Sequence, residues 1–156
     1  MSLGQSKIEA LDPFKLHRFV QAQEPIYQTV LAELRQGQKR THWMWFIFPQ
    51  IAGLGYSSMA KYYAIQNRAE AQGYFSHHIL GPRLIECSET VLKISGRSAL
   101  DIFGQPDQQK LRSSMTLFAA LTPTDSVFTQ VLDQYFEGER DTNTLKRLDL
   151  IAQDKL

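Results

Sequence analysis

The stretch SALDIFGQPDQQKLRSSMTLFAALTP, residues 98–123, contains the start and stop signals of two consecutive helices. Ser98 with Asp101 three residues later is typical of a helix N-terminus, because each side chain can accept a hydrogen bond from the other residue's amide. Gly104 suits the left-handed position that ends many helices, and Pro106 suits the first position of a new one. The stretch therefore predicts a short helix, a glycine stop and a longer helix that ends at the closing Thr-Pro pair.

Similar signals recur along the rest of the chain. A proline directly follows Asp12 and Glu24, as expected when a capping side chain precedes the first helical position. Asn67 lies three residues before Glu70, as in a capping box. Apolar residues at helical spacing follow each signal. We expect further helices after Asp12, Glu24, Asn67 and Gly81, after Thr124 or Asp125, and after Asp141 or Thr142.

These signals, with few alternating apolar and polar residues, predict an all-α fold, a single compact domain of about seven or eight helices. One segment is of uncertain type. Residues 43–48 form a run of six apolar residues rich in aromatics, and periodicity does not distinguish a buried strand from a buried helix there. Both alternatives stay open for this segment.

Length and composition favour one ordinary globular domain. The 156 residues are 43% hydrophobic and 21% charged, close to the averages of folded proteins and unlike disordered or collagen-like chains. No repeat or long linker divides the sequence. We expect a helical domain over residues 13–152 and an N-terminal tail over residues 1–12, in which Met1–Gly4 resembles an expression remnant.

The charge balance and the single cysteine restrict the partners and the compartment. Seventeen basic and sixteen acidic residues give a net charge of +1, which predicts neither a nucleic-acid nor a membrane partner. Cys87 has no second cysteine to pair with, which favours a reducing, cytoplasmic location. His77 and His78 are adjacent and point about 100° apart on a helix, so no metal site is expected.

Both tryptophans lie in one segment that is a candidate ligand wall. Trp43 and Trp45 stand between His42 and Gln50. Indole rings can stack on a base or sugar, while polar side chains at the two ends fix its orientation. The alternative is that the segment is buried core and its indole N–H groups are satisfied locally.

A glycine-rich turn follows this segment. Gly53 and Gly55 would let backbone amides approach an anion, and Ser58 or Ser57 could cap a helix whose N-terminus attracts phosphate. Lys61 would add positive charge. The turn lacks the third glycine of a dinucleotide fingerprint and the Gly-Lys-Ser/Thr of a Walker loop, so it identifies no bound cofactor. The alternative is an ordinary tight turn.

A third group of candidates lies on predicted helices. Asp107, Lys110 and Ser114 share one helix face, with Ser113 beside it. Asp107 could act as a base or stabilise charge, and Lys110 could stabilise an anion. Arg83 stands in the first turn of another helix, where a cation needs a nearby anion from a ligand or an acidic residue. The alternatives are an exposed ion pair and serines that permit close packing.

Taken in order, these motifs resemble the bacterial and fungal family called domain of unknown function 1810, over about residues 13 to 150. The resemblance implies a compact, mostly helical domain and no established reaction. Some family members carry a calpastatin-like label, but calpastatin is a disordered repeat protein and this composition is that of a globule. His77 and His78 depart from the family's histidine-proline pair, which leaves the turn before Leu80 open. The resemblance is carried by His42–Gln50, Gly53–Gly55 with Ser58, Leu80–Leu84, Ile102–Gly104 with Asp107 and Lys110, and Ser113–Phe118.

The sequence supports two hypotheses about function. The domain could bind or hydrolyse a small anionic, nucleotide-like ligand related to NAD or ADP-ribose, or it could be a non-catalytic protein-interaction domain. The first requires the candidate residues to meet in one partly exposed pocket, and the second is favoured if they lie on separate faces. Whether the chain is an enzyme, and how many copies associate, stays open.

Overall fold

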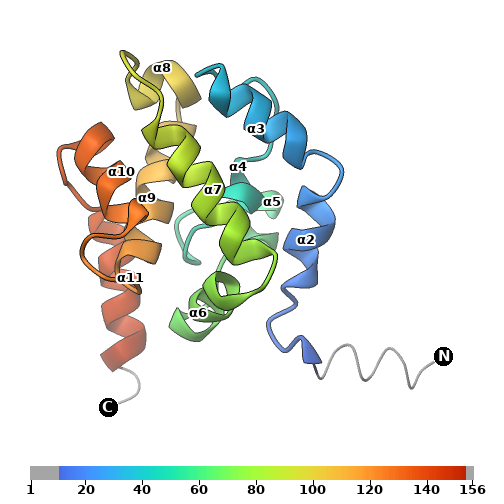
Figure 1. The fold of residues 1–156 in the computed structure, drawn as a ribbon. Helices are drawn as coiled ribbons and strands as arrows, with labels where there is room; N and C mark the ends of the chain where they lie inside the picture. The colour runs from blue at the N-terminus through green and yellow to red at the C-terminus, as the bar shows by residue number, and fades with distance from the viewer. Residues whose placement is uncertain (1–10, 154–156) are drawn as a thin grey trace.

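The computed structural model describes residues 11–153, and the side chains of those up to Asp149. This part of the chain forms ten helices and no strand, which confirms the all-α prediction (Figure 1). Within it, no helix is long and apolar enough to span a lipid bilayer. The helices are α2 (His17–Gln23), α3 (Tyr27–Arg35), α4 (Met44–Ile47), α5 (Ser58–Tyr62), α6 (Arg68–Ser76), α7 (Leu80–Leu92), α8 (Ala99–Phe103), α9 (Asp107–Ala119), α10 (Val127–Phe136) and α11 (Thr142–Gln153).

Several of the predicted caps start their helices. Ser98 and Asp101 form a complete capping box at α8, and Gly104 ends that helix with a φ of 71°. The Asn67 side chain accepts a hydrogen bond from the Glu70 amide at the start of α6. At α10 the cap is Ser126 instead of Thr124 or Asp125, so the helix begins later than expected.

Asp12 caps α2 from a greater distance than the sequence predicts. The helix begins at His17, because Lys15 has a φ of 55° and interrupts the helical path. The Asp12 carboxylate still accepts hydrogen bonds from the amides of Leu16 and His17, at 2.8 and 3.0 Å. The side chain therefore serves the helix start while the proline that follows it stays outside the helix.

His77 starts α7 in the turn that the resemblance left open. Its Nδ1 accepts from the amides of Ile79 and Leu80, at 3.1 and 3.3 Å. The helix accordingly begins at Leu80, and Gly81 lies inside its first turn. No larger residue fits at Gly81, because a Cβ there would stand 2.1 Å from the carbonyl oxygen of Phe75.

Two helices, α7 and α9, organise the core. Helix α7 crosses the front of the view in Figure 1 and packs against α3, α6 and α10. Helix α9 contacts α4, α6, α8, α10 and α11. Aromatic rings join the layers, since Phe118 lies 5.6 Å from Tyr74 and 5.7 Å from Phe128 between ring centroids. This packing places α4 directly beside α9.

The aromatic segment 43–48 is helical in its middle, where it forms the single turn α4. Trp43 is fully buried, and its indole N–H donates to Glu33 at 2.9 Å. Burial alone would raise the pKa of Glu33, but hydrogen bonds from Thr41, Arg40 and Trp43 outweigh it and lower the pKa to about 2. Trp43 is therefore a core residue, anchored by a buried carboxylate.

Candidate functional site

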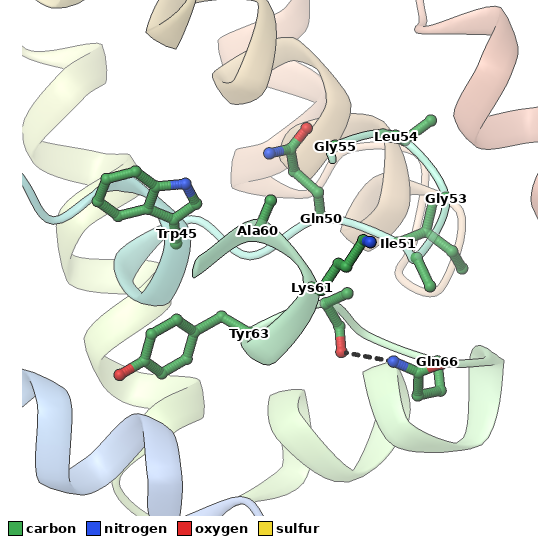
Figure 2. A pocket seen from close by; sticks show the side chains of 12 residues that line it. Trp45, Gln50, Ile51, Gly53, Leu54, Gly55, Ala60, Lys61, Tyr63 and Gln66 are labelled. Atoms are coloured by element: carbon green, nitrogen blue, oxygen red, sulfur yellow. Dashed lines mark hydrogen bonds between the residues drawn. The ribbon is translucent and has the colours of Figure 1, made fainter. Parts of the chain in front are cut away.

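A hollow lies between the segment around α5 and the first turns of α9 and α11. It consists of two adjoining pockets, of about 190 and about 480 Å³. We call it the Trp45 hollow. Figure 2 shows the smaller pocket, with the rings of Trp45 and Tyr63 on one side and the turn through Gly53, Leu54 and Gly55 on the other. The residues common to both pockets are Trp45, Gln50, Leu54, Gly55 and Ala60.

A short parallel bridge between Ile51 and Ile65 holds the α5 segment in place. The Ile65 amide donates to the Gln50 carbonyl, and the Ala52 amide donates to the Ile65 carbonyl, both at 2.8 Å. Ile51 and Ile65 are buried, whereas α5 itself contains no buried residue. The segment from Ala52 to Ala64 is thus a surface excursion that forms one wall of the hollow.

The two glycines of this wall are explained by different features, close packing at Gly55 and a left-handed backbone at Gly53. A Cβ at Gly55 would lie 2.7 Å from the Cβ of Ala60. Gly53 has a φ of 98°, and a Cβ there would meet the guanidinium of Arg147 at 2.5 Å. The glycines therefore permit a tight turn, which was the alternative to an anion site. Both also line the hollow.

The start of α5 is an ordinary serine cap. The hydroxyl of Ser57 accepts a hydrogen bond from the Ala60 amide at 3.1 Å. Ser57 lines the larger pocket, whereas Ser58 is the first residue of α5 and lines neither. A helix of five residues has too small a dipole to attract an anion by itself. Lys61, on the same helix, lines the smaller pocket and supplies a full positive charge.

Trp45 and Lys110 are in contact in the lining of the larger pocket. The Lys110 ammonium lies 4.9 Å from the centroid of the Trp45 ring, a cation–π contact. Lys110 also lies 3.3 Å from Oδ1 of Asp107, whose Oδ2 is 2.8 Å from the nearly buried ammonium of Lys39. One carboxylate is therefore shared between two ammonium groups, which leaves a surplus positive charge beside the indole.

The far side of the larger pocket is polar. Asp141 is 7% exposed and accepts a hydrogen bond from the Gln109 side-chain amide at 3.1 Å. Ser113 also lines this side, and its hydroxyl donates to the Gln109 carbonyl. Sequence reasoning missed Gln109, Asp141 and Asn143. The spacing of Gln109 four residues before Ser113 could have indicated the first, but no sequence signal places the start of α11 beside α9.

The remaining candidates lie outside the hollow. Arg83 pairs with Glu24 at 3.0 Å and stacks on Tyr27. Its anion is therefore an acidic residue, as the second alternative for Arg83 predicts. Ser114 is fully buried, and its hydroxyl has no hydrogen-bond partner among the described residues. Asp107, Trp43, His42 and Ser58 also line neither pocket, although Asp107 reaches the hollow through Lys110.

Eight of the fourteen candidate residues line one hollow: seven of the predicted ligand-binding residues, and Lys110, which was predicted to be catalytic. The structure brings Trp45, Gln50, Gly53, Gly55, Ser57, Lys61, Lys110 and Ser113 around the Trp45 hollow. Between Leu11 and Asp149, it groups no three His, Cys, Asp or Glu side chains in positions that could hold a metal ion. The chemistry available in the hollow is that of an indole face, ammonium groups, side-chain amides, serine hydroxyls and the Asp141 carboxylate.

Comparisons with known proteins agree with this architecture. The model of the family described as protein of unknown function DUF1810 matches residues 13–148. The crystal structure of the conserved hypothetical protein Rv1873 from Mycobacterium tuberculosis is similar, with 51% identity and a TM-score of 0.87. That similarity covers 88% of this chain and 99% of the mycobacterial one. A search of curated proteins gave no match. The family match spans most of the chain, and the chain therefore belongs to the DUF1810 family.

Proposed function

We propose that the Trp45 hollow binds a small anionic, nucleotide-like ligand related to NAD or ADP-ribose. The observation that carries the proposal is the meeting of the Trp45 indole with the Lys110 ammonium in one solvent-accessible pocket. The larger pocket, of about 480 Å³, has a volume in the range of small-ligand sites, which is roughly 300–1,000 Å³, and the smaller pocket adds about 190 Å³ beside it.

The preference for an anion follows from the charges around the hollow. Lys39 and Lys110 share the single carboxylate of Asp107, so the cluster carries one more positive than negative charge. Lys61 adds a second cation from the opposite wall. Asp141 adds a negative charge to the larger pocket, so the three ammonium groups of Lys39, Lys61 and Lys110 outnumber the carboxylates of Asp107 and Asp141 by one. A phosphate group would compensate the surplus charge next to Lys110.

The preference for a planar group follows from Trp45. Its neighbours in the chain, Met44 and Phe46, are buried, but Trp45 is half-buried and its ring contributes to the wall of both pockets. Once the Lys110 ammonium turns away from its face, an indole inside a concave site is a good stacking surface for a base or another flat ring. The aromatic surface and the cations therefore match the two parts of a nucleotide.

The arrangement favours binding over hydrolysis. Both oxygens of Asp107 are paired with ammonium groups, one with Lys39 and one with Lys110. A general base needs an oxygen in contact with the attacking water. The amides of Gln108, Gln109 and Lys110 at the start of α9 donate to backbone carbonyls, so they do not form an oxyanion hole.

Titration with AMP, ADP-ribose, NAD and nicotinamide mononucleotide tests the proposal, with calorimetry as the direct measurement and tryptophan fluorescence as the local one. Binding should quench the signal of Trp45, and Lys110→Met should weaken binding about tenfold through the loss of a charge-assisted contact. Lys93→Met is the matched control, because Lys93 lines a different pocket. The proposal fails if none of the four compounds binds, or if Lys110→Met leaves their affinities unchanged.

A protein-interaction domain is the second candidate, and one observation favours it. Tyr56, Met59 and Tyr62 follow one face of α5 and its preceding turn, with 87%, 40% and 58% of their surfaces exposed. Exposed apolar groups that cluster are typical of a docking surface. Sedimentation of the protein at high concentration would test self-association. A protein that sediments as a monomer would count against a second copy as the partner. An association that Tyr62→Ser leaves unchanged would count against this surface.

A further inference from the structure

The side-chain amide of Gln109 lies at the α9 side of the Trp45 hollow, next to Lys110. We infer that its oxygen accepts a hydrogen bond from the carboxamide of a pyridinium nucleotide, and that Asp141 is the positioning residue that fixes its orientation. This inference rests on the proposed function, because it names the chemical class of ligand for the same hollow.

Asp141 is held rigidly between α9 and α11. Its Oδ2 accepts from the amide and the hydroxyl of Thr144, at 2.9 and 2.6 Å. Its own amide donates to the hydroxyl of Thr116 at 2.9 Å. Only 7% of the residue is exposed, so its side chain has little freedom to move. The remaining oxygen, Oδ1, therefore has a fixed position at the edge of the hollow.

That oxygen determines which way the Gln109 amide points. Oδ1 of Asp141 accepts a hydrogen bond from Nε2 of Gln109 at 3.1 Å. An ionised carboxylate only accepts hydrogen bonds, so rotating the amide by 180° would set two acceptor oxygens against each other. The Gln109 Oε1 is then the atom left for a ligand, and it accepts no hydrogen bond from any residue in the described part of the chain. A ligand that presents an N–H donor at this point can therefore bond to Gln109.

Trp45 indicates which ring lies beside that donor. The indole already holds a cation over its face, since the Lys110 ammonium is 4.9 Å from the ring centroid. A pyridinium ring is both flat and cationic, so it can replace the ammonium over the indole. Lys110 would then turn to the phosphate of the same ligand. The carboxamide on such a ring carries the N–H that Gln109 accepts, whereas the acid or ketone analogue carries none.

The experiment compares two ligands of equal charge and nearly equal shape. Nicotinamide mononucleotide has the carboxamide, and 3-acetylpyridine mononucleotide replaces its NH₂ by a methyl group. We expect the unmodified protein to bind the carboxamide about fivefold tighter, as measured by titration calorimetry. Gln109→Leu should reduce this ratio to about one. Gln72→Leu is the matched control, because Gln72 is an exposed glutamine on α6 outside the hollow and its loss should leave the ratio unchanged.

Asp141→Asn tests the positioning role. An asparagine can both donate and accept, so the Gln109 amide can then rotate and the ratio should fall below that of the unmodified protein. A residue that only maintained the fold would change both affinities together and leave their ratio intact. Because Gln109 is exposed, Gln109→Leu should fold normally. It therefore tests whether Gln109 accepts the ligand's hydrogen bond even if Asp141→Asn does not fold.

The outcomes separate this inference from the proposed function. Equal binding of the two ligands, or a ratio that survives Gln109→Leu, overturns the inference. Binding of ADP-ribose through Lys110 without binding of either pyridinium compound also overturns it, while the proposed function stands. If none of the nucleotides binds, both fail.

Discussion

Glu33→Gln isolates the charge of the buried carboxylate that anchors Trp43. Three donors, the amides of Arg40 and Thr41 and the indole N–H of Trp43, share Oε1, and the Thr41 hydroxyl donates to Oε2. A glutamine can keep its oxygen at the first position and offer its NH₂ to the hydroxyl oxygen at the second. The substitution therefore preserves the shape of the site and removes its negative charge.

The size of the effect follows from the pKa of Glu33, which is lowered from 4.5 to about 2. Each unit of pKa corresponds to about 1.36 kcal/mol, so the charged form contributes about 3 kcal/mol to the free energy of unfolding at neutral pH. The folded pKa is the lower one, so the unfolded chain binds more protons between the two values. This contribution is thus complete above pH 4.5 and is lost as the pH falls toward 2. About 1.4 kcal/mol should remain at pH 3.

Urea denaturation of both proteins at pH 7 and pH 3 measures this difference. Glu33→Gln should be less stable by about 2 to 3 kcal/mol at pH 7, with the gap roughly halved at pH 3. Glu89→Gln, an exposed glutamate on α7, is the control and should stay within about 0.5 kcal/mol. A gap that is equally large at both pH values would refute the electrostatic reasoning, because loss of shape does not titrate.

Three further outcomes concern stability and reactivity. Gly55→Ala should destabilise the protein by about 1 to 3 kcal/mol in urea denaturation, because the added Cβ would lie 2.7 Å from that of Ala60. An unchanged midpoint would show that the backbone around α5 shifts without cost. Ser114→Ala should raise the free energy of unfolding by about 1 kcal/mol, since it removes a buried hydroxyl without a partner in the described residues; a loss of that size would point to a hidden hydrogen bond. Burial raises the pKa of Cys87 to about 12, so a disulfide reagent at pH 8 should label it only in urea, and rapid labelling of the native protein would contradict its burial.

Local signals predicted the helices well, because a cap acts within four residues of itself. Ser98 and Asn67 start the helices that their side chains suggest. Asp12 and the cap of α10 differ from the prediction in position: Lys15 turns the chain before α2, and Ser126 takes the place that Thr124 or Asp125 was expected to hold. The short turn α4 could not be predicted, since six consecutive apolar residues fit a strand as well as a helix.

The candidate site could be predicted only in part. Trp43 and Trp45 are two residues apart, yet one is fully buried and the other lines the hollow. On a helical turn two residues differ in direction by about 200°, and the sequence does not say which direction is the core. Contacts between residues distant in the sequence, as at Arg83 and Asp141, were equally impossible to predict. Arg83 forms an ion pair with Glu24 at the end of α2 and lies outside the hollow, while Asp141, just before α11, lines the hollow.

The Ile51–Ile65 bridge has a consequence for how a ligand could enter. The thirteen-residue excursion from Ala52 to Ala64 packs Leu54 and Tyr63 against the core but buries no side chain on α5, so detaching α5 costs less apolar contact than opening α7 or α9. Local opening of that excursion should therefore occur at a lower free energy than global unfolding, and α5 amides should exchange with deuterium well before those of α7 and α9. Such an opening would widen the hollow beside Trp45 while the helices of the core keep their packing.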